Sequence, residues 1–265
     1  MVIHMKNVFG YPEFDAEGEE ILCTYDNAYS DMLMDIRVYR MEPGRKRDFC
    51  RRGEETAVLL LSGTVTFGWE GRTETVSRRD VFTDGPYALH ACAGEEITVE
   101  AQTDAEILVQ CTKNDTAFSG RLYRPEDAPW VYSCVGKFGN VAKRRVNTIF
   151  DKDIAPWSNM VLGEVLNDRG NWSGYLPHRH PQPECYSFKF DRPEGFGASF
   201  VGDQVFKSVD NSFSAITGGC LHPQAVAPGF QMYTCWMIRH LDGDPWLQTT
   251  RNEDERYLWL HDAQE

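Results

Sequence analysis

Short apolar runs separated by turn-forming clusters dominate this chain. Each run is rich in β-branched and aromatic residues, and the clusters between them contain Gly, Pro and Asp, as at 61–63 (LSG) and 69–71 (WEG). Such clusters mark tight turns. The predicted strands are 33–39, 57–61, 64–69, 72–76, 96–101 and 106–111, followed by 158–165, 174–179, 184–190, 197–201, 212–216 and 231–239. Because helical periodicity is nearly absent, the pattern predicts an antiparallel sandwich, barrel or jelly roll.

The strand pattern also predicts two domains. Residues 113–140 contain Pro, Gly, Asp and Asn with little periodicity, and they separate two series of strands. We therefore predict an N-terminal barrel at 1–125 and a C-terminal barrel at 126–265. The segment TDGPYALH ends at His90 and the segment ITGGCLH ends at His222, which suggests an internal duplication; chance similarity is the alternative.

The overall charge limits the partners. A formal net charge of −13 disfavours nucleic acid and anionic membranes, because both are held by clustered Lys and Arg. An anionic small molecule needs a local basic patch, for which residues 143–145 (KRR) and Arg179 are the candidates. The N-terminal residues lack a signal-peptide pattern and no run is long enough to cross a bilayer, which predicts a cytoplasmic protein.

The cysteines indicate free thiols. The chain has eight of them, with no C-x-x-C pair, and in a cytoplasmic chain of 265 residues buried thiols are more common than a disulfide framework. The sequence does not determine the oligomeric state, and a homo-oligomer is one possibility.

The segment 171–190 carries the chemistry. Residues two apart in a strand point to the same face, so His178 and His180 should face inward together while Arg179 faces outward. A turn at 181–183 brings Glu184 beside them, and His222 is the best candidate for a fourth ligand. Three imidazoles and one carboxylate suit a divalent ion of zinc, manganese, iron, nickel or cobalt, with positions left for water or substrate.

The remaining histidines are expected to be packing or surface residues. These are His4, His90, His240 and His261. The first half has no His-x-His pair, so its barrel is predicted to bind no metal and to serve a structural or oligomeric role. Glu55 and His90 are interpreted there as packing residues, with remnants of a lost site as the alternative.

The pattern H-x-H-x3-E with a distant His resembles that of the cupin superfamily. The words around it, LGEVLNDRGNWSGYLPHRHPQPE and GGCLHPQAVAPGFQMYTCW, resemble the 5-deoxy-glucuronate isomerase family, as do RRVNTIF, SRRDVFTDGPYA and DERYLW. The resemblance implies a bicupin, all-β, of two antiparallel jelly-roll barrels. It implies metal ligands at His178, His180, Glu184 and His222 and the conversion of 5-deoxy-glucuronate to 5-dehydro-2-deoxy-gluconate in myo-inositol breakdown.

An aldose–ketose isomerase also needs groups that move protons and hold a carboxylate. Tyr186, Tyr233 and Glu184 are the candidate catalytic residues, with Tyr175 a further candidate near the substrate. The resemblance implies Arg144 or Arg145 as the partner of the substrate carboxylate. Three alternatives remain: a related isomerase acting on the unsaturated uronate of pectin breakdown, a cupin dioxygenase, and a non-catalytic sugar-binding cupin.

Overall fold

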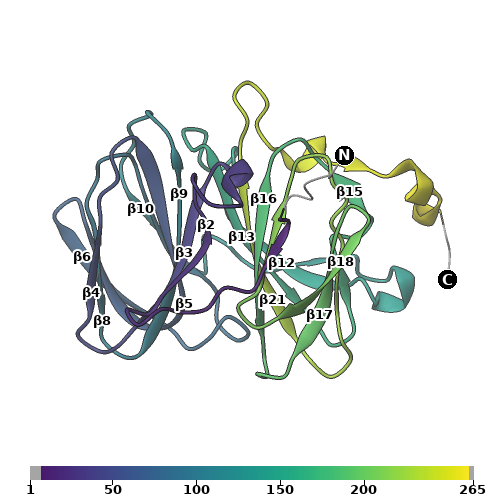
Figure 1. The fold of residues 1–265 in the computed structure, drawn as a ribbon, viewed down its shortest axis with the longest axis horizontal. Helices are drawn as coiled ribbons and strands as arrows, with labels where there is room; N and C mark the ends of the chain where they lie inside the picture. Colours follow the sequence, from purple (N-terminus) through teal and green to yellow (C-terminus); the bar gives the residue numbers. More distant parts are fainter. Residues whose placement is uncertain (1–6, 263–265) are drawn as a thin grey trace.

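Two barrels of antiparallel strands lie side by side in the computed structural model, which describes residues 7–262 (Figure 1). The all-β prediction is confirmed. His4 lies outside the described residues. No helix within 7–262 is long and apolar enough to cross a membrane.

The N-terminal barrel is filled by alternate residues of its strands. Its strands are β2 (Glu19–Cys23), β3 (Asp35–Met41), β4 (Lys46–Phe49), β5 (Glu54–Trp69), β6 (Arg72–Arg78), β7 (Tyr87–Ala91), β8 (Ile97–Ala101), β9 (Ala105–Lys113) and β10 (Arg121–Tyr123). Val58 and Leu60 of β5 point into the barrel and pack against Val99 and Ile107. This period of two is the one expected of a half-buried strand.

Strand β5 differs from the prediction. The expected turn at 61–63 is absent, and one strand runs through it from Glu54 to Trp69. Its first half pairs with β7 and β9, and its second half pairs with β6 and β8, so the strand passes from one side of the barrel to the other. Gly63 allows the bend: its φ is +95°, and a Cβ there would lie 2.3 Å from the carbonyl oxygen of Asp104.

The C-terminal barrel consists of two facing sheets. One has the order β1-β19-β16-β21-β13-β12-β11 and the other the order β14-β20-β17-β18. The bounds are β1 (Phe9–Gly10), β11 (Val131–Ser133), β12 (Arg144–Phe150), β13 (Met160–Asn167), β14 (Trp172–Ser173), β16 (Glu184–Phe190), β17 (Phe196–Val201), β18 (Gln204–Val209), β19 (Phe213–Ile216), β20 (Gln224–Val226) and β21 (Met232–Arg239). A short pair, β15 (His178–Arg179) with β22 (Asn252–Glu253), and 3-10 turns η1 (Ser30–Met32), η2 (Phe138–Asn140), η3 (Gln248–Thr250) and η4 (Glu255–His261) complete the fold.

Strand β1 crosses between the two halves of the sequence. It pairs with β19, Phe9 opposite Ser214 and Gly10 opposite Phe213, and so belongs to the C-terminal barrel. A Cβ at residue 10 would lie 2.2 Å from the Phe213 ring, so this close crossing requires glycine. Apart from β1, the sheets change from one barrel to the other between β10 and β11. A domain division at 125/126 stays a prediction, and the N-terminal segment contributes to both barrels.

A shared core joins the barrels. In β16, Cys185 faces the N-terminal barrel, while Tyr186 and Phe188 face the interior of their own barrel. From the other side Ile36 and Leu59 enter the same inter-barrel core. Both faces of β16 are therefore covered, and six of its seven residues are buried.

Two buried polar clusters also lie between the barrels. Arg78 and Glu164 are both fully buried and form two hydrogen bonds, of 2.8 and 3.2 Å. Asn147 Nδ2 and the Tyr233 hydroxyl donate to the same carboxylate at 2.8 and 2.7 Å. Burial of the Tyr233 hydroxyl beside Glu164 raises its pKa well above the ordinary value. All of Glu164's partners are charged or polar, so the buried carboxylate is compensated.

The second cluster is formed by Glu55 and His90. His90 Nε2 lies 2.8 Å from Glu55 Oε2, and the other carboxylate oxygen accepts the Asn159 backbone N–H at 2.7 Å. The His90 ring stacks on Phe150 of the other barrel, with 4.3 Å between centroids. His90 therefore faces the inter-barrel contact and not the interior of its own barrel, unlike His222 in the other half. This packing role agrees with the interpretation made from sequence.

Candidate metal centre

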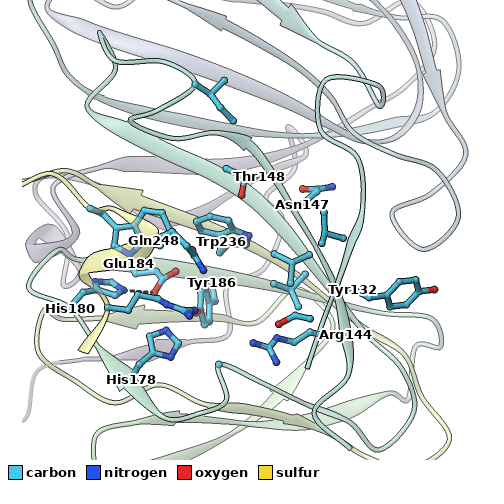
Figure 2. Close-up of a pocket in the computed structure, with 18 of the residues that line it drawn as sticks. Tyr132, Arg144, Asn147, Thr148, His178, His180, Glu184, Tyr186, Trp236 and Gln248 are labelled. Atoms are coloured by element: carbon cyan, nitrogen blue, oxygen red, sulfur yellow. Dashed lines mark hydrogen bonds and ion pairs between the residues drawn. The ribbon is translucent and has the colours of Figure 1, made fainter. Parts of the chain in front are cut away.

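Three side chains converge inside the C-terminal barrel. One ligand atom from each of His180, Glu184 and His222 lies within 4.8 Å of the others, and all three residues are buried. His180 follows β15, Glu184 opens β16, and His222 precedes β20, so three separate segments meet. Figure 2 shows His180 and Glu184 in contact at one side of a pocket.

Backbone carbonyls orient the imidazoles. His180 Nδ1 lies 3.0 Å from the Gln182 oxygen, His222 Nδ1 lies 2.8 Å from the Cys220 oxygen, and His178 Nδ1 lies 3.0 Å from the Leu176 oxygen. A carbonyl accepts only from Nδ1–H, so each ring presents the lone pair of Nε2 to the site. Metal-binding imidazoles are commonly held in this way through their second nitrogen.

The contacts within the cluster fit a bound cation. Glu184 Oε2 lies 3.2 Å from Nε2 of both His180 and His222, and the buried His222 Nε2 has no hydrogen-bond partner among residues 7–262. Lone pairs that face one another without a hydrogen are satisfied by a divalent ion between them. Although burial opposes the charged form, hydrogen bonds and charge from His180 and His222, when a proton rather than a metal ion occupies Nε2, lower the pKa of Glu184 to about 2. The carboxylate is therefore ready to bind at neutral pH.

His178 stands beside this group. Its ring centroid lies 4.8 Å from that of His222 and 6.4 Å from that of His180, and the side chain is buried. Burial, together with the charges of His222 and Arg251, lowers the pKa of His178 to about 3. The ring thus stays neutral with Nε2 available. Its outer neighbour Arg179 turns away to Asp254, at 2.8 Å, as strand alternation predicts.

The local structure differs from the prediction at one point. The expected strand 174–179 is reduced to His178–Arg179, preceded by the turn at Gly174. The alternation of inward and outward side chains nevertheless extends from His178 to His180, both of them buried.

A cavity of about 530 Å³ adjoins the cluster, a size that suits a small ligand. Figure 2 shows Arg144 across this cavity from His178 and Tyr186. Its lining includes His178, His180, Glu184, Tyr186, Arg144, Asn147, Thr148, Trp236, Trp246, Gln248 and Arg251.

The expected catalytic and substrate residues separate into two groups. Arg144, Tyr186 and Glu184 line the cavity. Tyr175, Arg145 and Tyr233 are not among its lining residues: Arg145 lies over the Trp130 ring, the Tyr175 carbonyl accepts from Arg144 at 3.2 Å, and Tyr233 is buried in the inter-barrel core. Their positions give no support to a role in the site, and we do not include them in it.

Tyr186 lines the cavity beside the His/Glu cluster. Its ring centroid lies 5.9 Å from that of His222. Burial and the adjacent Glu184 carboxylate raise the pKa of Tyr186 well above its ordinary value, so the phenol keeps its proton. A neutral phenol can donate a hydrogen bond where negative charge develops.

Sequence reasoning noted DPW at 244–246 within the family resemblance but assigned no site role to the C-terminal segment. Trp246, Gln248 and Arg251 all line the cavity, and the Trp246 ring stands edge-on to His180 at 6.4 Å. Because this segment has no strand periodicity, only the sequence motifs that resemble the isomerase family could have identified these residues. Asn147 and Thr148 were covered in the same way, within RRVNTIF.

The paired barrels and the His/Glu cluster define a cupin with a candidate metal centre. The chain belongs to the KduI/IolB family, whose model matches residues 11–260. Among curated relatives, the chain is 30% identical over 196 residues to the 5-deoxy-glucuronate isomerase of Lacticaseibacillus casei. This alignment covers 68% of this chain and 71% of that protein. The chain is 24% identical over 280 residues to the 5-deoxy-glucuronate isomerase of Bacillus velezensis, covering 97% and 99%.

Solved structures show the same fold. An IolB-like protein from Salmonella typhimurium LT2 matches with a TM-score of 0.86 at 18% identity, covering 96% of this chain and 99% of that one. A formate complex of oxalate decarboxylase from Lactobacillus farciminis matches with a TM-score of 0.69 at 12% identity, covering 98% and 91%. The predicted cupin fold is thereby confirmed.

Proposed function

We propose that this protein is a metal-dependent aldose–ketose isomerase that converts 5-deoxy-glucuronate to 5-dehydro-2-deoxy-gluconate. The observation that carries the metal dependence is the convergence of His180, Glu184 and His222 beside His178, each imidazole turned by a backbone carbonyl. The substrate follows from family membership and from relatives named 5-deoxy-glucuronate isomerase. The cytoplasmic location and a homo-oligomeric state remain predictions.

The reaction redistributes hydrogen within one molecule. One hydrogen leaves C2 and one is added to C1, while the hydroxyl hydrogen on C2 is lost and the oxygen on C1 gains one, so no atom or electron is gained overall. His178, His180, Glu184 and His222 would hold the ion, which when bound supplies Lewis-acid stabilisation of the two oxygens. Zinc, manganese, iron, nickel and cobalt all accept such ligands.

The side chains around the centre bind and orient the substrate. The neutral phenol of Tyr186 is placed to hydrogen-bond an oxygen of the substrate as charge develops. The apolar faces of Trp236 and Trp246 line the same cavity and exclude water. Arg144 and Arg251 line the pocket together with the carboxylates of Asp127 and Glu184, so a bound divalent ion would make its formal charge positive, which suits an anionic sugar acid.

The decisive experiment combines elemental analysis with turnover. Purified protein should contain about one divalent ion per chain and should convert 5-deoxy-glucuronate to the ketose, followed by NMR. Running the unsaturated uronate of pectin breakdown in parallel separates the two isomerases. Oxygen consumption with neither sugar isomerised would favour a cupin dioxygenase, and uronate binding without turnover would favour a sugar-binding cupin.

Changing Tyr186 to phenylalanine tests the proton-transfer role. The ring stays in place while the hydroxyl is lost, so kcat should fall by about a hundredfold, within the range of general acid–base catalysis. Metal content should not change, because Tyr186 is not a ligand. The measurement is steady-state kinetics with metal analysis of the same samples. Unchanged kcat would show that the phenol takes no part in proton transfer.

A further inference from the structure

The substrate carboxylate needs a cation, and the two expected arginines are poorly placed for it. Arg145 lies over the ring of Trp130 and does not line the cavity. Arg144 lines the cavity, but its terminal nitrogens already donate to the carbonyls of Ala142 and Tyr175, at 2.9 and 3.2 Å, and contact Cys134 Sγ at 3.3 Å. These bonds use three of its five N–H donors to hold the loop before β12, so fewer donors remain for a ligand.

Arg251 is differently placed. It lines the same cavity as His178, His180 and Glu184, it is partly buried, and its Nε atom is buried without a hydrogen-bond partner among residues 7–262. An unsatisfied buried guanidinium nitrogen costs free energy unless a ligand accepts from it. A guanidinium offers two parallel N–H groups that match a carboxylate.

The backbone around Arg251 holds it beside the candidate metal centre. We call residues 246–254 the C-terminal strap. Its strand β22 pairs with β15, Glu253 opposite His178 and Asn252 opposite Arg179. The backbone N–H of Asp254 donates to the Pro177 oxygen at 2.9 Å. Arg251 immediately precedes β22, so its position is tied to the strand that carries His178.

Ion pairs fasten the end of the strap. The Asp254 carboxylate accepts from Arg179 at 2.8 Å and from Arg256 at 2.9 Å. At the other end, Trp246 is buried among the core residues of the C-terminal barrel. Both ends are thus anchored, and the strap presents Gln248 and Arg251 to the cavity between them.

We infer that Arg251 binds the carboxylate of the sugar acid and selects uronates over neutral sugars. This inference rests on the proposed function for the identity of the substrate, but binding tests it independently of turnover. The carboxylate lies at the far end of the substrate from the reacting carbons. Arg251 therefore orients the sugar acid so that its other end reaches the His/Glu cluster.

The test compares D-glucuronate with its neutral amide, D-glucuronamide, by calorimetric titration of the metal-loaded protein. The wild type should prefer the acid by about tenfold to a hundredfold, the range of a charge-assisted hydrogen-bonded pair. Arg251→Gln should abolish that preference and leave the affinity for the amide and the metal content unchanged. Arg251→Lys should keep part of the preference, because the charge remains without the paired donors.

Arg256→Gln is the matched control. It removes the same charge from the adjoining segment, but its side chain is 68% exposed and contacts Asp254, which keeps Arg179 as a partner. It should retain the preference for the acid. The inference is overturned if Arg251→Gln still prefers glucuronate while correctly folded by thermal melting, or if the wild type shows no preference. If the preference depends on Arg251 but no deoxy-uronate is isomerised, the proposed function fails and the inference stands.

Discussion

Replacing His180 with alanine should remove the bound metal and lower kcat/KM by about a thousandfold or more. The substitution deletes one Nε2 that faces Glu184 and His222 and leaves the carboxylate in a buried site with one partner fewer. Lewis-acid stabilisation of several kcal/mol corresponds to this loss of rate. Elemental analysis and steady-state turnover of 5-deoxy-glucuronate measure the two effects on the same sample.

His261→Ala is the matched control for this experiment. That imidazole is 46% exposed and contacts Glu253, and it is not part of the His/Glu cluster. Both metal and activity should survive. A His180→Ala protein that keeps its ion and its rate would show that the cluster is not a metal centre.

Replacing Arg78 with methionine should lower the free energy of unfolding by about 3–5 kcal/mol. The Arg78 and Glu164 side chains are fully buried, so removal of the guanidinium leaves the carboxylate without its charged partner. The loss should appear in urea denaturation as a lower midpoint. The substitution should also lower activity, because Asn147 donates a hydrogen bond to the same carboxylate and lines the cavity.

The neighbouring residue supplies the comparison. Arg79 carries the same charge, but its side chain is 72% exposed and pairs with Asp84 at the surface. Arg79→Met should cost less than about 1 kcal/mol. Adding Glu164→Gln to Arg78→Met should recover part of the stability, because the uncompensated charge is then gone. Equal effects at 78 and 79 would contradict the importance of the buried pair.

The sequence predicted the class of fold and the elements of the candidate centre because both depend on short-range alternation. The run 184–190 is observed as β16 with these bounds, and His180, Glu184 and His222 meet as expected. Strand geometry fixes which side chains share a face, and this located His180 and the neighbouring Glu184. His222 is distant in sequence, and the family resemblance supported its choice.

Features that depend on contacts between distant segments could not be predicted in this way. Nothing local shows that Glu54–Trp69 is one bent strand, because Gly63 reads as a turn until β8 and β9 are placed beside it. Nothing in the periodicity assigns Arg251 to the cavity, since the strap is held by pairing with β15. Tyr233 was a candidate on sequence alone, but its strand faces two cores and the tyrosine belongs to the one between the barrels.

The crossing of β1 has a practical consequence for dividing this molecule. A fragment starting at residue 126 would lack Phe9 and Gly10, and the outer hydrogen-bonding groups of β19 would be left bare. Uncovered strand edges recruit other chains, so such a fragment should self-associate in solution. Supplying a peptide that spans residues 7–12 would restore the missing strand beside β19, whereas Cys185 and the other residues that face the N-terminal barrel would stay uncovered.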